Sequence, residues 1–327
     1  MNDFGYSRAA SIDEAVALAR QPGAMLLAGG TTLVDLSKCD VARPNALVDI
    51  SRIPGLDEVR LDEDNAAIGA LATMSHVAVQ AGIRENFPAI SESLLLAASA
   101  QLRNMATIGG NLMQRTRCVY FRDPAGYSAC NKRDPGSGCA ALGGIAHDHA
   151  VLGASDACIA VYPGDLAVAL TALEAVVRTN LREIQIRDFF VEPGDTPQRE
   201  TVLEPGEMIT EIIVPRSPLS ANSTYLKVRE RKSYEFASAS AAVGLAFEAD
   251  GRTIRDIHVA LGGLATKPWR ALAVEEALRG KIIDEQAIRD VSRLAVEGAV
   301  AQGANAYKIE LAPRVVARAI LKVGGIQ

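Results

Sequence analysis

Thr107-Ile-Gly-Gly-Asn111 opens the stretch around which this sequence of 327 residues is organised. Four of the five cysteines follow within the 41 positions from 118 to 158, where an even distribution would place fewer than one: Cys118, Cys130, Cys139 and Cys158. Such clustering indicates that the four thiols share one centre. The fifth cysteine, Cys39, stands apart and is expected to be a small buried side chain.

Three kinds of centre use clustered cysteines, and they require different spacings. Disulfides suit small secreted domains without a sufficient core, whereas this chain is 49% hydrophobic and long enough to build one. Structural zinc favours short C-x2-4-C hooks, but the gaps here are eleven, eight and eighteen residues. An iron-sulfur cluster can take its thiolates from separate loops. The spacing therefore favours a cluster, while zinc and unliganded structural cysteines remain alternatives.

The residues between the cysteines also suit a cluster. The segments 123–126, 134–138 and 143–144 are rich in Gly, Pro and Asp, so the backbone can turn around a bound group. Positively charged side chains beside the thiols favour the thiolate form that binds metal: Arg115, Arg117, Lys132 and Arg133.

Length and charge limit the classes of protein to consider. A chain of this size predicts two or three domains, and its net charge of -5 argues against a nucleic-acid-binding surface. No apolar run reaches the roughly 18 residues that a membrane-spanning helix needs. Residues 1–6 lack a basic segment followed by an apolar one, so we expect a soluble chain without an export signal of its own.

Residues 1–55 are predicted to form a small β-α-β unit. Ser11 and the acids after it predict a helix over 11–20, followed by strands at 25–28 and 46–50. Gly29-Gly30-Thr31-Thr32 follows the first strand, and consecutive N-H groups in such a turn can hold a phosphate or pyrophosphate. An ordinary strand-to-turn connection is the alternative interpretation of this common pattern.

The remainder is predicted to form two further units, which gives an α+β fold class. Residues 56–216 alternate between short strands, at 175–178, 182–186 and 209–215, and helices, at 73–80, 89–100 and 166–174. Residues 216–224 are a predicted linker, and residues 225–327 are predicted to form a sheet covered by helices, with strands at 225–229, 242–247 and 254–261 and helices at 270–279, 284–300 and 312–322.

Four motifs, in this order, resemble the FAD-binding subunit of the xanthine dehydrogenase and carbon monoxide dehydrogenase family: Leu27-Ala-Gly-Gly-Thr31, Thr107-Ile-Gly-Gly-Asn111, Gly164-Asp165 and Tyr225-Leu-Lys-Val-Arg229. The resemblance covers essentially the whole chain and implies a two-part FAD-binding domain followed by a C-terminal domain of a sheet and helices. Three cysteine-containing stretches resemble, within that family, the subunits of periplasmic aldehyde oxidoreductases that carry a 4Fe-4S cluster as well as FAD: Gln114-Arg-Thr-Arg-Cys118, Cys130-Asn-Lys-Arg133 and Pro135-Gly-Ser-Gly-Cys139-Ala-Ala-Leu142.

The resemblance implies roles for individual residues. The FAD-binding set would be Leu26, Leu27, Ala28, Gly29, Gly30, Thr31, Thr32, Leu33, Thr107, Gly110, Asn111, Asp165, Ile209 and Lys227, and the cluster ligands would be Cys118, Cys130, Cys139 and Cys158. Simpler interpretations exist for several of them. Thr107–Asn111 could be only a tight turn, Asp165 a helix N-cap and Lys227 a solvated strand residue. The histidines His76, His147, His149 and His258 are expected to be structural, because none fits a metal hook.

The same resemblance implies an electron-transfer flavoprotein subunit without a catalytic side chain of its own. Its partners would be a large molybdenum subunit, which oxidises the aldehyde, and a small 2Fe-2S subunit, in a heterotrimer that could be doubled. Electrons would leave to an external acceptor, and the location would be periplasmic by co-export with a signal-bearing partner, or else cytoplasmic. The rival functions are a zinc-braced structural subunit without flavin and an FAD subunit without iron.

Overall fold

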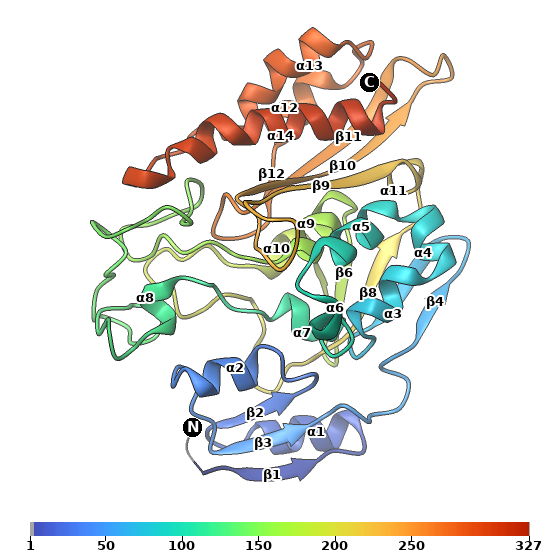
Figure 1. Ribbon diagram of the computed structural model, residues 1–327. Coiled ribbons are helices and arrows are strands. Elements are labelled where there is room, and N and C mark those ends of the chain that lie inside the picture. Colours follow the sequence, from blue (N-terminus) through green and yellow to red (C-terminus); the bar gives the residue numbers. More distant parts are fainter. Residues whose placement is uncertain (1–2, 327) are drawn as a thin grey trace.

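The computed structural model describes residues 3–326. Three units follow one another in the sequence and are stacked in space (Figure 1). The first unit is a parallel sheet of order β1-β3-β2, built from β1 (Gly5–Arg8), α1 (Ile12–Ala19), β2 (Ala24–Leu27), α2 (Leu33–Lys38) and β3 (Ala46–Asp49). Ser11 caps α1 by accepting a hydrogen bond from the Glu14 N-H, as its position predicted. The edge strand β1 was not predicted, because all four of its side chains are exposed and give no apolar alternation.

The second unit is an antiparallel sheet with helices on one side. The strand order is β4-β5-β8-β6-β7, with β4 (Val59–Leu61), β5 (Asn65–Gly69), β6 (Val176–Thr179), β7 (Glu183–Gln185) and β8 (Ile209–Pro215). The helices are α3 (Met74–Val79), α4 (Ala81–Asn86), α5 (Pro88–Leu96), α6 (Ala100–Arg103), α7 (Ile108–Leu112), α8 (Val119–Arg122), α9 (Asp165–Ala172) and α10 (Ile186–Phe189). Every residue of α9 is buried, since this helix packs between α5 of its own unit and the sheet of the third unit.

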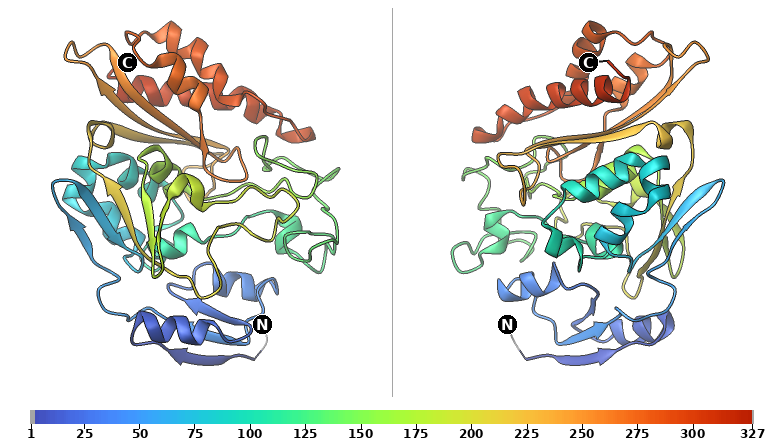
Figure 2. Two further views of the ribbon diagram at one scale, coloured as in Figure 1. Left: turned by 180° about the vertical axis from the view of Figure 1, so that it is seen from behind. Right: turned by 45° about the vertical axis from the view of Figure 1, so that its right-hand side comes forward.

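The third unit is an antiparallel sheet of order β12-β11-β10-β9, buried on both faces (Figure 2). Its elements are α11 (Pro218–Ala221), β9 (Ser223–Val228), β10 (Ala239–Phe247), β11 (Ile254–Gly262), β12 (Trp269–Arg270), α12 (Leu272–Leu278), α13 (Glu285–Val291), the 3-10 turns Ser292–Val296 and Gly303–Asn305, and α14 (Tyr307–Val323). Small residues face α9: a Cβ on Gly262 would lie 2.6 Å from the Val168 side chain. The opposite face packs against α14 through larger side chains such as Val243 and Leu245.

Three predicted elements differ from the structure. The last helix begins at Tyr307 rather than 312, because its apolar stripe packs on β10 and outweighs the hydrogen bond lost at Pro313. The predicted helix over 284–300 is α13 followed by a 3-10 turn, and it stops before Gly298, whose φ is +75°. The predicted linker over 216–224 contains α11, which Ser217 and Ser220 close as a capping box, and the first residues of β9.

The cysteine segment, residues 118–160, projects from one side of the second unit (green in Figure 1). It consists of loops and isolated bridges, with the four-residue α8 at its start. Among residues 3–326, we find no helix with both the length and the apolar composition needed to cross a bilayer.

Candidate functional site

The turn between β2 and α2 presents a row of free backbone donors. The N-H groups of residues 29–33 donate no hydrogen bond to any acceptor within residues 3–326. Gly30 adopts a φ of +71°, and a Cβ on Gly29 would lie 1.9 Å from the Met105 carbonyl oxygen. The two glycines therefore allow both the shape of the turn and its close packing against the second unit. Five consecutive donors form the kind of nest that accepts a phosphate.

A second turn faces the first from the start of α7. Thr107 is the N-cap of α7, and its hydroxyl accepts the Gly110 N-H at 3.3 Å, so this stretch is a capped helix rather than only a tight turn. Asn111 donates its side-chain amide to the Met74 sulfur at 3.4 Å. Its Oδ1 atom is buried and lacks a partner among the described residues. An orphaned acceptor of this kind fits a ligand that donates an N-H or O-H group.

A buried ion pair joins the second and third units. The Asp165 carboxylate accepts hydrogen bonds from the Tyr225 hydroxyl at 2.5 Å and from Lys227 Nζ at 2.8 Å. Burial raises the pKa of Asp165, and the Lys227 ammonium opposes that rise. Two simpler interpretations are wrong here, because Gly164 rather than Asp165 is the N-cap of α9 and the Lys227 side chain is 0% exposed.

These features border one cleft of about 420 Å³ to which all three units contribute. Thr31, Thr32 and Asp35 come from the first unit, Gly110, Asn111 and Asp165 from the second, and Tyr234 and Phe236 from the third. We call it the interunit cleft. Arg117 closes one side, because its guanidinium lies 4.9 Å from the centre of the Phe236 ring and donates to Asp35 at 3.1 Å.

The other predicted FAD-binding residues lie outside the lining of this cleft. Leu26, Leu27, Ala28, Gly29, Gly30 and Leu33 form β2, the turn and the first position of α2, behind Thr31 and Thr32. Ile209 is 7% exposed and belongs to the core of the second unit. It lies at a register shift between β6 and β8, where strict alternation is interrupted. The structure thus shows no contact between the Ile209 side chain and the cleft.

The structure brings the four clustered cysteines together around one small cavity, the cysteine cavity, which is lined by Cys118, Cys130, Cys139 and Cys158. Cys130 and Cys139 pair in an antiparallel bridge, so their side chains lie on the same face. The remaining lining is largely apolar, with Tyr120, Phe121 and several alanines. Within residues 3–326, no three His, Cys, Asp or Glu side chains are close enough to bind a single metal ion. Cys39 lies apart from this cavity, at the end of α2. Its side chain is half-buried, whereas a buried one was expected.

Burial favours the protonated form of two of the clustered thiols, Cys118 and Cys158, in the absence of a ligand. It raises the pKa of Cys118 to about 12, and the backbone amides of Tyr120 and Phe121 only partly oppose this. Burial also raises the pKa of Cys158, with Lys132 acting in the opposite direction. A metal centre that binds thiolates would displace these protons.

His149, which the sequence analysis predicted to be structural, contacts one of the cysteines. His149 Nε2 lies 3.2 Å from Cys118 Sγ, and the residue is 5% exposed. Burial lowers the pKa of His149, and the nearby Lys308 ammonium acts in the same direction. The 30 residues between Cys118 and His149 fit no ligand motif, so the sequence offered no signal for this contact.

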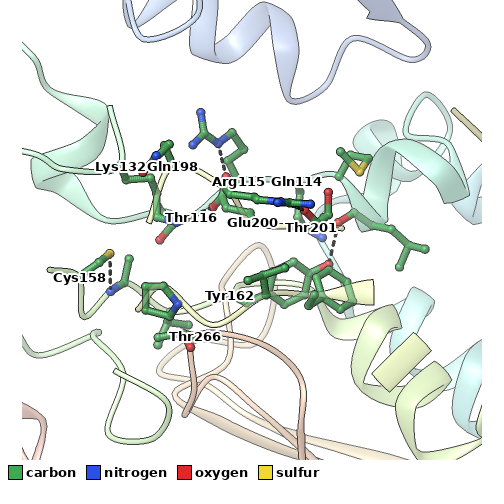
Figure 3. Close-up of a pocket in the computed structure, with 18 of the residues that line it drawn as sticks. Gln114, Arg115, Thr116, Lys132, Cys158, Tyr162, Gln198, Glu200, Thr201 and Thr266 are labelled. Carbon is green, nitrogen blue, oxygen red and sulfur yellow. Dashed lines mark hydrogen bonds and ion pairs between the residues drawn. The ribbon is translucent and has the colours of Figure 1, made fainter. Parts of the chain in front are cut away.

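A separate cavity of about 320 Å³ lies on the far side of Cys158 (Figure 3). Cys158 and Lys132 lie toward one end of it, and Tyr162 and Gln114 lie toward the other. Lys132 Nζ donates to Glu200 at 2.9 Å and to the Pro197 carbonyl at 2.8 Å, and Arg115 pairs with the same Glu200. Because these charges are satisfied within the chain, they brace the cysteine segment against residues 190–203.

The interunit cleft and the cysteine cavity are neighbours. Arg117 lines the cleft, and the next residue, Cys118, lines the cysteine cavity. A further cavity of about 560 Å³ is lined by Arg117, Cys118 and Asp165 together, and it connects the two regions. A group bound in each would be separated by only a few side chains.

Comparisons with known proteins cover the whole chain. Residues 2–217 match the model of the FAD binding domain in molybdopterin dehydrogenase, and residues 223–323 match the CO dehydrogenase flavoprotein C-terminal domain. The chain is 43% identical to the aldehyde oxidoreductase FAD-binding subunit PaoB of Escherichia coli, over 97% of each chain. It is 29% identical to the carbon monoxide dehydrogenase medium chain of Afipia carboxidovorans, over 97% of this chain and 95% of that one.

A solved structure confirms the fold. The carbon monoxide dehydrogenase chain from Hydrogenophaga pseudoflava superimposes with a TM-score of 0.74 at 26% identity, covering 98% of this chain and 96% of that chain. The α+β fold class predicted from the sequence is therefore confirmed.

Proposed function

The chain belongs to the FAD-binding subunits of the molybdenum hydroxylase family, and on that premise we propose that it carries electrons from partner subunits through FAD and its own 4Fe-4S cluster to an external acceptor. The observation that carries this proposal is the adjacency of the interunit cleft and the cysteine cavity at Arg117 and Cys118. The chain is part of an oxidoreductase whose substrate chemistry takes place on another subunit.

The interunit cleft fits FAD. The free N-H groups of residues 29–33 would hold its pyrophosphate, and the orphaned Asn111 Oδ1 would accept a hydrogen bond from an N-H or O-H group elsewhere on the cofactor. Asp165, neutralised by Lys227, supplies a fixed polar wall at the boundary of the third unit. When bound, a flavin accepts one or two electrons, and the chain's part is to hold it and exclude water.

The lining of the cysteine cavity supports a 4Fe-4S cluster. Such a cluster takes four thiolates around one body, and all four cysteines line one cavity whose remaining lining is largely apolar. The gaps of eleven, eight and eighteen residues between the cysteines lack the short hooks that structural zinc favours. The 43% identical relative named as an aldehyde oxidoreductase subunit supports an aldehyde as the substrate of the assembly.

The relatives support a multi-subunit assembly. They are named as a FAD-binding subunit and a medium chain, which implies a large and a small partner. We propose the large partner to be the molybdenum subunit and the small one to carry 2Fe-2S clusters, in a heterotrimer that reaches the periplasm through a signal on a partner. In this assembly the chain needs no general base, because it only receives and releases electrons.

The test is anaerobic reduction by an aldehyde. The chain is co-expressed with its molybdenum and 2Fe-2S partners, and flavin absorbance is followed after addition of an aromatic aldehyde. We expect the flavin absorbance to fall in the assembled complex and to stay constant in the isolated chain. An assembled, molybdenum-loaded complex that oxidises the aldehyde while its flavin stays oxidised would contradict the proposal. A colourless chain containing zinc would favour the structural alternative.

A further inference from the structure

We propose that His149 donates a hydrogen bond from Nε2 to the sulfur of Cys118 and thereby raises the reduction potential of the 4Fe-4S cluster. This rests on the proposed function, since it requires the cluster. It gives His149 a role in tuning the cluster, since this residue contacts the ligand Cys118 but is not one of the four cysteine ligands.

The contact is held in place from a distant part of the chain. Asn305, which is 0% exposed, donates its side-chain amide to the backbone carbonyls of His149 at 3.3 Å and Ala150 at 3.1 Å. Lys308, which is 1% exposed, donates to the Asp148 carbonyl at 3.2 Å and to the Gly263 carbonyl at 2.6 Å. Two buried side chains of the third unit thus fix the backbone on both sides of the imidazole, although this segment is otherwise a loop.

The surroundings of the ring determine which nitrogen carries the proton. Nε2 lies 3.2 Å from Cys118 Sγ, whereas Nδ1 is buried and has no partner among the residues that the structure describes. A thiolate ligand can only accept a hydrogen bond, so a proton on Nε2 satisfies both groups. The Nε2 atom of His149 is therefore the donor directed at the sulfur.

A hydrogen-bond donor at a ligand sulfur raises the reduction potential of the cluster. Reduction adds negative charge to the cluster and its thiolates, so the hydrogen bond is stronger in the reduced state and raises the potential. The four cysteines are not equivalent in this respect. Cys118 faces the imidazole, whereas within residues 3–326 the Cys158 sulfur accepts a hydrogen bond only from the Ala160 backbone N-H, at 3.4 Å. The imidazole also lies on the Arg117 side, where the cysteine cavity borders the interunit cleft.

The competing explanation is packing, because the His149 ring also lies 5.9 Å from the ring of Tyr120. Two unbranched replacements of similar size separate the explanations. His149→Gln keeps an N-H donor, and His149→Met removes it. His147→Leu is the control, since His147 lies two residues away but is half-exposed and pairs with Asp148 instead of a cysteine.

The experiment is a redox titration of the cluster followed by electron paramagnetic resonance, on the complex assembled with its partners, with iron and acid-labile sulfide measured on each sample. We expect His149→Met to shift the equilibrium toward the oxidised cluster by roughly tenfold, which is about 59 mV for a one-electron couple. The potential of His149→Gln should lie nearer to that of the unmodified protein, and His147→Leu should leave it unchanged.

Each outcome decides whether His149 acts as a hydrogen-bond donor or only through packing of its ring. Loss of iron in His149→Met but not in His149→Gln would also support the donor. Full iron with an unchanged potential in His149→Met, or equal effects of both replacements on potential or iron, would overturn it. Absence of iron from the unmodified protein would instead overturn the proposed function, and the iron analysis reports this separately.

Discussion

The interunit cleft and the cysteine cavity are neighbours, but they are built differently. The walls of the cleft come from helix ends, tight turns and a buried ion pair, so its polar groups are positioned before any cofactor binds: the 29–33 amides, Thr107 and Asp165 with Lys227. The cysteine cavity lies in a segment of loops, and burial keeps the thiol of Cys118 protonated, with a pKa of about 12. From this difference we expect that the scaffold alone forms the flavin site, whereas the cysteine segment depends on the proposed metal centre for stability.

The largest expected effect is loss of the cluster without loss of flavin. Cys139→Ser removes one of the two thiols that the backbone β-bridge between Cys130 and Cys139 places side by side, and serine is a poor ligand for iron. We expect iron to fall from about four atoms per chain to nearly none while most FAD remains. Thermal unfolding of this variant should occur at a lower temperature, because a centre that binds only the folded state adds to the free energy of unfolding. The gain is about 4 kcal/mol when the ligand concentration is a thousandfold above its dissociation constant.

Cys39→Ser is the matched control, since Cys39 lies outside the cysteine cavity. It should leave iron and flavin unchanged. Iron that persists in Cys139→Ser would remove Cys139 from the ligand set, and simultaneous loss of FAD would show that the two sites are not independent.

Gly29→Ala should have the opposite effect, which is loss of FAD without loss of iron. The new Cβ would lie 1.9 Å from the Met105 carbonyl oxygen, so the turn must move away from the second unit and its amides would no longer face the cleft. We expect FAD content measured by absorbance to fall at least about tenfold, which corresponds to about 1.4 kcal/mol of binding free energy, while iron stays bound.

Gly5→Ala tests whether any added methyl in the first unit has this effect. A Cβ at Gly5 meets its nearest atoms at 3.8 Å, an ordinary contact. Normal FAD content is expected for this variant. Normal FAD content in Gly29→Ala would mean that the turn does not hold the cofactor.

The ion pair at the boundary of the third unit should contribute to stability even without cofactor. Lys227→Met leaves the Asp165 carboxylate buried with only the Tyr225 hydroxyl as a donor, so we expect the free energy of unfolding to fall by about 3 kcal/mol in urea denaturation. Lys267→Met removes a more exposed pair with Glu192 and should cost less than about 1 kcal/mol. Equal losses in the two variants would show that the burial of Asp165 does not require a cation.

The smallest effect concerns a carboxylate remote from both cavities. Hydrogen bonds from Arg182 and Thr179 lower the pKa of Glu207 from 4.5 to about 2. Because the folded state lowers this pKa, Glu207 stabilises the fold above pH 4.5, and this contribution is lost as the pH falls toward 2.

Unfolding of the unmodified chain and Glu207→Gln, compared across this pH range, measures the contribution directly. The difference in unfolding free energy should shrink as the pH falls, while flavin and iron contents at neutral pH stay unchanged. A difference that is constant with pH would assign the effect to packing rather than to charge.

The sequence predicted features that depend on local geometry. Ser11 marked the start of α1, the two glycines before Thr31 marked a turn with free amides, and the density of thiols over 118–158 predicted that they meet. It did not predict features that depend on distant residues. His149 is positioned by Asn305, 156 residues later, and no short-range pattern carries that information. Ile209 was expected at the cleft, but its side chain belongs to the core, at a register shift between β6 and β8 that no short-range pattern predicts.

The central claim is that one chain holds a 4Fe-4S cluster beside FAD, and the most direct test is the stoichiometry of the purified chain co-expressed with its partners. Iron, acid-labile sulfide, zinc and flavin are measured on one anaerobic sample. We predict about four iron and four sulfide per chain, one FAD and no zinc. One FAD with neither iron nor sulfide, or zinc in place of iron, would contradict the account.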